Sequence, residues 1–117
     1  MKVKSEIITR EYNHNGANFC SRYVPIETNE WIGIQLPNKE DFFSHGYSVI
    51  HIATGCKIEG NFLTKKEAKE FAQAIDRLKL PCAFWRTDSL QKIKKSEKII
   101  GSKKYKLLKD LCNRKRR

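Results

Sequence analysis

Five short segments in the first 62 residues have the alternation, or the β-branched and aromatic content, that is typical of β-strands. They are residues 3–9, 19–26, 31–36, 47–53 and 56–61. The polar stretch NHNGAN at 13–18 predicts a turn between the first two segments. In segment 47–53 apolar residues stand at both odd and even positions, so we expect protein to cover both faces of that strand at least in part. Thr54-Gly55 has the composition of a tight turn, which predicts a β-hairpin over 47–61.

The clearest helix signal begins at Thr64. Thr64 and Glu67 have the spacing of a capping box, in which each side chain satisfies a backbone N–H of the other residue. Leu63, just before the cap, is placed to form a hydrophobic staple with the first apolar residue of the helix. An apolar stripe follows at helical spacing: Ala68, Phe71, Ala72, Ile75 and Leu78. Pro81 ends the element.

These elements predict an α+β fold: a small antiparallel sheet of three to five strands, packed by one capped helix at about 65–79. A chain of 117 residues is long enough for one domain. We assign residues 1–86 to an α+β body and residues 87–117 to a C-terminal arm, which is basic and partly helical. A narrow apolar stripe predicts that the arm docks on another surface: Tyr105, Leu108, Leu111 and Cys112. We expect removal of 103–117 to leave the body folded.

The charge is concentrated in the arm. The whole chain has a net charge of +11; residues 87–117 hold twelve basic residues against three acidic ones, a net +9, and the rest holds twelve against ten. Such a distribution is typical of a protein that contacts a polyanion. The candidate phosphate contacts are Lys92, Lys94, Lys95, Lys98, Lys103, Lys104, Lys106, Lys109, Arg114, Lys115, Arg116 and Arg117. Arg86 and Trp85 form a basic–aromatic pair that could stack on a base, although a Trp just after a helix can equally close the core.

The sequence offers little sign of catalysis. It has no glycine-rich phosphate loop, nucleophile elbow or metalloprotease helix motif, so we expect no enzyme activity, no cofactor and no small-molecule substrate. No histidine pairs with a cysteine at ligand spacing, so we expect no metal site, but a zinc site assembled from distant residues such as His51, Cys56 and Cys82 remains open. Scattered cysteines, no signal-like start and no long apolar run favour a cytosolic protein without a membrane partner.

Residues 30–79 resemble a known DNA-binding domain. Trp31, the strand and turn over 47–55 and the motif GNFLTKKEA at 60–68 are similar to the arm-type domain of tyrosine recombinases from phages and transposable elements. The resemblance implies a three-stranded sheet backed by a helix, with the exposed sheet face in the major groove. The candidates for contact with base edges are then Gln35 on the first strand, Ser48 or His51 on the second, and Lys57 or Glu59 on the third. The N-terminal strands and the basic arm have no counterpart in that domain.

Two functions fit this pattern. The first is a small non-enzymatic accessory or regulatory protein that binds DNA or RNA, encoded by a phage or another mobile element. The alternative is a protein–protein interaction module or inhibitor that docks on a nucleic-acid-processing complex, for example a phage inhibitor of a host defence nuclease. Positive charge serves both, because an acidic or nucleic-acid-binding protein surface attracts a cationic arm as a phosphate backbone does.

Overall fold

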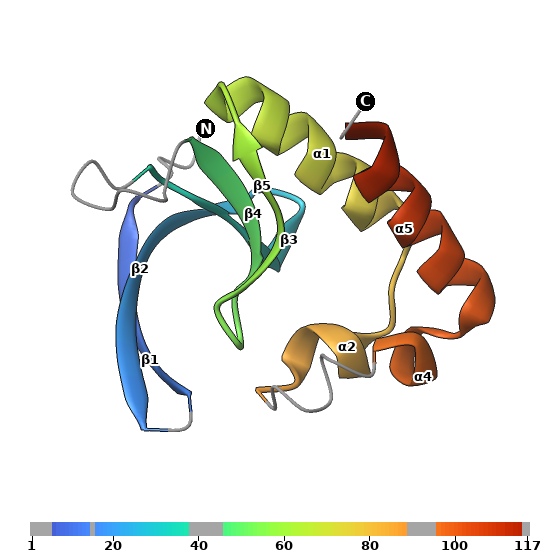
Figure 1. Ribbon diagram of the computed structural model, residues 1–117, viewed down its shortest axis with the longest axis horizontal. Helices are drawn as coiled ribbons and strands as arrows, with labels where there is room; N and C mark the ends of the chain where they lie inside the picture. The colour runs from blue at the N-terminus through green and yellow to red at the C-terminus, as the bar shows by residue number, and fades with distance from the viewer. Residues whose placement is uncertain (1–5, 15, 38–45, 89–95, 116–117) are drawn as a thin grey trace.

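The computed structural model describes residues 6–14, 16–37, 46–88 and 96–115. Its strands form one five-stranded antiparallel sheet in the order of the chain (Figure 1). The strands are β1 (Ile8–His14), β2 (Ala17–Ile26), β3 (Asn29–Gln35), β4 (Tyr47–His51) and β5 (Cys56–Phe62). The predicted α+β class and the predicted hairpin over 47–61 are therefore confirmed, the hairpin being β4–β5.

The first hairpin differs from its prediction. A strand was expected at 3–9 and a polar turn at 13–18, whereas β1 runs to His14, paired with Ala17. The Asn13 side-chain amide donates a 2.6 Å hydrogen bond to Asn18 Oδ1 on the opposite strand. The polar side chains of Asn13 and Asn18, which suggested a turn, thus form a hydrogen bond with each other across the exposed strand pair β1–β2. Residues 3–5 of the predicted strand lie outside the described residues.

The sheet bends so that the β1–β2 hairpin covers the second face of β4. Tyr23 of β2 packs with Ile50 and Ile52 in a small core cluster, and the Tyr12 hydroxyl of β1 donates a 2.6 Å hydrogen bond to the Ile52 carbonyl. Burial raises the pKa of Tyr12 to about 12. Gly55 has φ +74°, and a Cβ there would lie 2.9 Å from the Tyr12 ring, so this turn requires glycine. The prediction of cover on both faces of this strand is confirmed.

Helix α1 (Lys65–Arg77) packs on the other face of the sheet. Its N-cap Thr64 accepts a 3.1 Å hydrogen bond from the Glu67 backbone N–H, as the spacing predicted. The apolar stripe turns inward, and its buried members are Ala68, Phe71, Ala72 and Ile75. The predicted staple is wrong, because Leu63 is 83% exposed and so has no tight packing partner on the helix.

The C-terminal segment packs onto the body. It contains α2 (Cys82–Arg86), α4 (Ser96–Ile100) and α5 (Ser102–Lys115), with α5 beside α1 in Figure 1. Ile100 and Leu108 are buried in the same hydrophobic cluster as the α1 stripe. Docking of the arm is therefore confirmed, and the surface it docks on is its own body. Removal of residues 103–117 would open this core, contrary to the expectation from the sequence.

Candidate nucleic-acid interface

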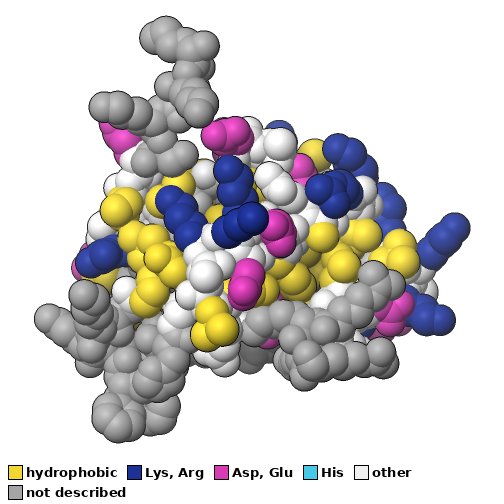
Figure 2. Space-filling model, turned by 90° about the horizontal axis from the view of Figure 1, so that it is seen from above, with side chains coloured by type: hydrophobic (Ala, Val, Ile, Leu, Met, Phe, Trp, Pro, Cys, Tyr) yellow, Lys and Arg dark blue, Asp and Glu magenta, His cyan; other side chains and the backbone are white. Residues whose placement is uncertain are grey.

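The outer side of α4 and α5 carries a group of exposed lysines. The apolar stripe of α5 faces the core: Tyr105, Leu108, Leu111 and Cys112. At 3.6 residues per turn the intervening positions face outward. Lys103, Lys106 and Lys109 of α5 are exposed, as is Lys98 of α4. Figure 2 shows Lys and Arg side chains along the right-hand edge of the molecule, the side on which α5 lies in Figure 1.

The charge of α5 is unbalanced over its whole length. Its 14 residues include six basic side chains and one acidic side chain, a net charge of +5. By contrast α1, with four basic and three acidic residues, has a net charge of +1. A helix of 14 residues is about 21 Å long, which is several phosphate spacings of a nucleic-acid strand. The outer side of α5 can therefore contact several phosphates at once.

Two of the candidate lysines also have contacts within the protein. The Lys104 amine donates a 2.6 Å hydrogen bond to the backbone carbonyl of Lys79, just past the end of α1. This bond ties α5 to the turn that follows α1. The Lys109 amine lies 5.4 Å from the centroid of the Tyr105 ring, in cation–π range. Lys98, Lys103 and Lys106 are therefore the better probes of a binding role.

The remaining basic candidates are at the two ends of the arm. Arg114 and Lys115 are the last two residues of α5. Arg86, the last residue of α2, is exposed. The others lie outside the described residues: Lys92, Lys94, Lys95, Arg116 and Arg117. The structure thus brings Lys98, Lys103, Lys106 and Lys109 together on two consecutive helices.

Trp85 does not belong to this surface. It is 5% exposed, and its ring stacks on His51 with a centroid separation of 5.8 Å and an interplanar angle of 17°. It also meets Phe84 edge to face, at 4.8 Å. Its ring is therefore packed mainly in the core, and the prediction that Trp85 stacks on a base is corrected in favour of the packing alternative. Trp85 also forms part of the wall of a pocket described below.

Two of the predicted base-reading residues are buried within the sheet. Ser48 and His51 are 4% and 1% exposed, because the β1–β2 hairpin covers one side of β4 and the helices cover the other. The Gln35 amide donates a 2.9 Å hydrogen bond to Ser21 Oγ. Lys57 is exposed and Glu59 is half-buried. A residue as buried as Ser48 or His51 cannot reach a base edge, so the mode of binding implied by the resemblance lacks two of its five candidates.

His51 is a structural residue of the core. Its Nε2 lies 2.6 Å from the Phe84 carbonyl and its Nδ1 lies 2.8 Å from Thr54 Oγ1. A carbonyl can only accept, so Nε2 must carry the proton, and Nδ1 accepts from the Thr54 hydroxyl. Burial lowers the pKa of His51, partly offset by the hydrogen bond to Phe84. With both ring nitrogens occupied, His51 is not a free ligand for the zinc site that the sequence left open.

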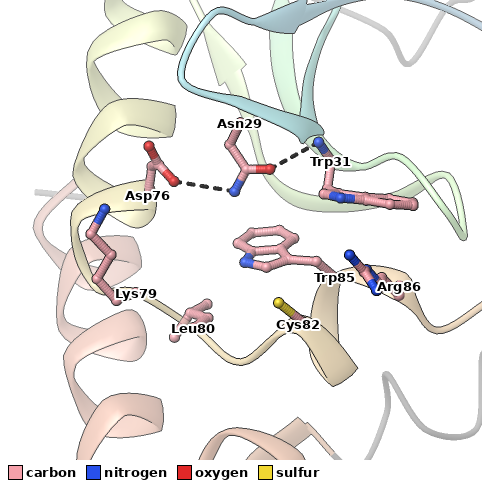
Figure 3. A pocket seen from close by; sticks show the side chains of 8 residues that line it. All are labelled: Asn29, Trp31, Asp76, Lys79, Leu80, Cys82, Trp85 and Arg86. Atoms are coloured by element: carbon pink, nitrogen blue, oxygen red, sulfur yellow. Dashed lines mark hydrogen bonds between the residues drawn. The ribbon is translucent and has the colours of Figure 1, made fainter.

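A pocket of about 260 Å³ lies where β3, the end of α1 and α2 meet (Figure 3). The Arg86 guanidinium carbon is 6.0 Å from the centroid of the Trp31 ring, and both residues line this pocket. The sequence predicted for Trp31 only a place in a strand. No local signal could have paired it with Arg86, which is 55 positions away.

Other site chemistry is limited in the part of the chain that the structure describes. No three His, Cys, Asp or Glu side chains there are grouped to hold a metal ion. The four cysteines are free thiols. None of the described helices is both long enough and apolar enough to cross a membrane.

Comparison with known proteins returned no match to any family model, curated protein or solved structure. The recombinase-like resemblance therefore stays a prediction.

Proposed function

We propose that this protein binds nucleic acid through the outer face of α4 and α5, as a non-enzymatic accessory or regulatory factor of a phage or another mobile element. The observation that carries the proposal is the fixed division of α5 into two sides. Leu108 and its neighbours bury one side in the core, and lysines occupy the other. A docked helix presents these charges without the entropy cost of ordering a flexible arm.

Solubility alone does not account for this arrangement. A small domain stays soluble with a net charge of about 2–8 in which both signs are interspersed. Here the chain has a net charge of +11, and +9 of it falls in residues 87–117. Charge of one sign concentrated in one segment of a chain produces a field that attracts a polyanion and speeds its association.

The test compares two triple variants with the same change in charge. In the first, Lys98, Lys103 and Lys106 are replaced by Gln; in the second, Lys65, Lys66 and Lys69 of α1 are replaced. All six lysines are exposed helix residues, and each triple lowers the net charge from +11 to +8.

Binding to single-stranded DNA, duplex DNA and RNA is measured by fluorescence polarisation over a salt series. We expect the first triple to lose on the order of a hundredfold in affinity at ~0.1 M salt and to lower the salt slope by about two to three. The α1 triple should change affinity much less. Equal losses of affinity in the two triple variants would mean that binding depends on net charge alone. Unchanged affinity in the first triple variant would exclude the outer face of α4 and α5 as the interface.

A second candidate function is docking on a protein of a nucleic-acid-processing complex. It is favoured by an open, partly apolar hollow beside Leu63, which includes Phe71 and Leu111 and has Glu67 and Glu70 on its wall. Exposed apolar side chains in a hollow are more typical of a protein partner than of a phosphate backbone. Failure of all nucleic-acid probes, together with a partner captured by wild type but not by Leu63→Asp, would support this candidate.

The four free thiols support a cytosolic location. A reducing compartment would keep them in this state.

A further inference from the structure

Trp31 and Arg86 are close neighbours in the pocket shown in Figure 3. Trp31 is half-buried, and Arg86 is exposed. Their separation of 6.0 Å is within the range of a cation–π interaction. Trp and Arg are also the side chains on which unpaired nucleobases stack in nucleic-acid-binding proteins.

Asn29 fixes the strand end that carries Trp31. Its Oδ1 accepts a 2.9 Å hydrogen bond from the Trp31 backbone N–H, and its Nδ2 donates a 3.1 Å bond to Asp76 Oδ1 at the end of α1. One side chain therefore ties β3 to α1. Such a tie holds the pocket in place before a ligand arrives, which lowers the entropy cost of binding.

The size and lining of the pocket suit one aromatic ring system. A cavity of about 150 Å³ holds benzene, and pockets for drug-sized ligands have about 300–1,000 Å³. At about 260 Å³ this pocket has room for a nucleobase but not for a large cofactor. Asp76 and Lys79 also line it, and they supply an acceptor group and a donor group for the edge of a base.

The pocket adjoins the basic surface. Lys79 lines the pocket, and its backbone carbonyl accepts the hydrogen bond from Lys104 of α5. Helix α2, which carries Arg86, packs on α4. A strand whose phosphates follow the outer face of α4 and α5 would therefore pass beside this pocket.

We infer that the pocket formed by Trp31 and Arg86 binds one unpaired base of a single-stranded nucleic acid whose phosphates lie on α4 and α5. The inference rests on the proposed function and adds the class of substrate. In a duplex both faces of a base are stacked and its edge is paired, so a duplex gains only the phosphate contacts.

The test uses three probes of equal length: a single strand, the same strand with abasic positions, and a duplex. Trp31→Ala should lower affinity for the base-bearing single strand about tenfold or more, and leave the abasic strand and the duplex nearly unchanged. Trp31→Phe keeps an aromatic ring and should retain most of the affinity. Arg86→Gln, at an exposed position, serves if Trp31→Ala does not fold. It should weaken binding of the base-bearing strand more than that of the abasic strand.

A neutral nucleoside separates the pocket from the phosphate interface. Adenosine should quench part of the tryptophan fluorescence of the wild type. The quenching should persist in the Lys98, Lys103 and Lys106 triple variant. It should disappear in Trp31→Ala, which loses the stacking ring but keeps Trp85, another residue of the pocket lining, as a reporter. Persistence in the triple supports the pocket even if the phosphate interface fails. Equal affinity of the wild type for base-bearing and abasic strands, or quenching unchanged in Trp31→Ala, overturns the inference while leaving the proposed interface standing.

Discussion

Replacement of Leu108 by Ala tests whether α5 is part of the folded core. Leu108 is 8% exposed and lies in the same hydrophobic cluster as Phe71 and Ile75 of α1. Truncation of a buried Leu to Ala lowers the free energy of unfolding by about 2–5 kcal/mol, because the apolar contacts are lost and a cavity remains. Leu108 lies on the last helix, where the surroundings can relax, so we expect about 2–4 kcal/mol. At roughly 4 °C per kcal/mol for a domain of this size, Tm should fall by about 8–16 °C.

Leu107 provides a matched control. It is the preceding residue of the same helix and is 45% exposed. Leu107→Ala makes the same chemical change with the same effect on helix propensity, so the two variants differ mainly in the burial of the side chain. We expect Leu107→Ala to cost less than about 1 kcal/mol.

The assay is urea denaturation followed by tryptophan fluorescence and by circular dichroism. The difference between the two variants reports packing of α5 alone. A neutral Leu108→Ala, or equal losses for both variants, would refute the docked position of α5. The lysines of α5 would then not form a fixed surface either.

Three further predictions concern the body. Thr64→Ala should lower the free energy of unfolding by about 1 kcal/mol, because the Glu67 N–H loses its acceptor. Thr64→Ser keeps a hydroxyl and should be near wild type. Equal losses in the two variants would contradict the role of Thr64 as the N-cap. Phe71→Ala should cost about 3–5 kcal/mol, whereas a neutral result in the same denaturation assay would show that α1 does not seal the core. The lowered pKa of His51 means that the unfolded chain takes up the proton more readily, so stability should hold above pH 6.5 and fall as pH drops below it. Between pH 7.5 and 5.5 the free energy of unfolding should change by at most ~1.4 kcal/mol per pH unit. This pH dependence should vanish in His51→Gln. A wild-type free energy of unfolding that does not change over this range would contradict the prediction.

Local signals in the sequence were sufficient for the secondary structure of the centre of the chain. The Thr64 cap, the stripe that follows it and the turn at Thr54-Gly55 depend on residues within a few positions of one another. Apolar residues on alternate faces of β4 also predicted cover on both sides. The first hairpin was misjudged because Asn13 and Asn18 have the composition of a turn, and only pairing across the strands satisfies them.

The charge pattern and the apolar stripe of α5 were likewise visible in the sequence, and together they predicted a basic segment that docks. They could not show what it docks on. Burial of Leu108 depends on α1, some 30 residues earlier, and the surface left exposed depends on that contact. The burial of Trp85 and the pairing of Trp31 with Arg86 were decided in the same way.

The sequence by itself therefore determined which residues are apolar, charged or able to cap, since these are properties of single residues and short spacings. The tertiary structure alone decided which aromatic ring faces solvent and which lysines share a surface. A side chain is exposed or buried according to what distant segments place over it, and no local pattern encodes that arrangement.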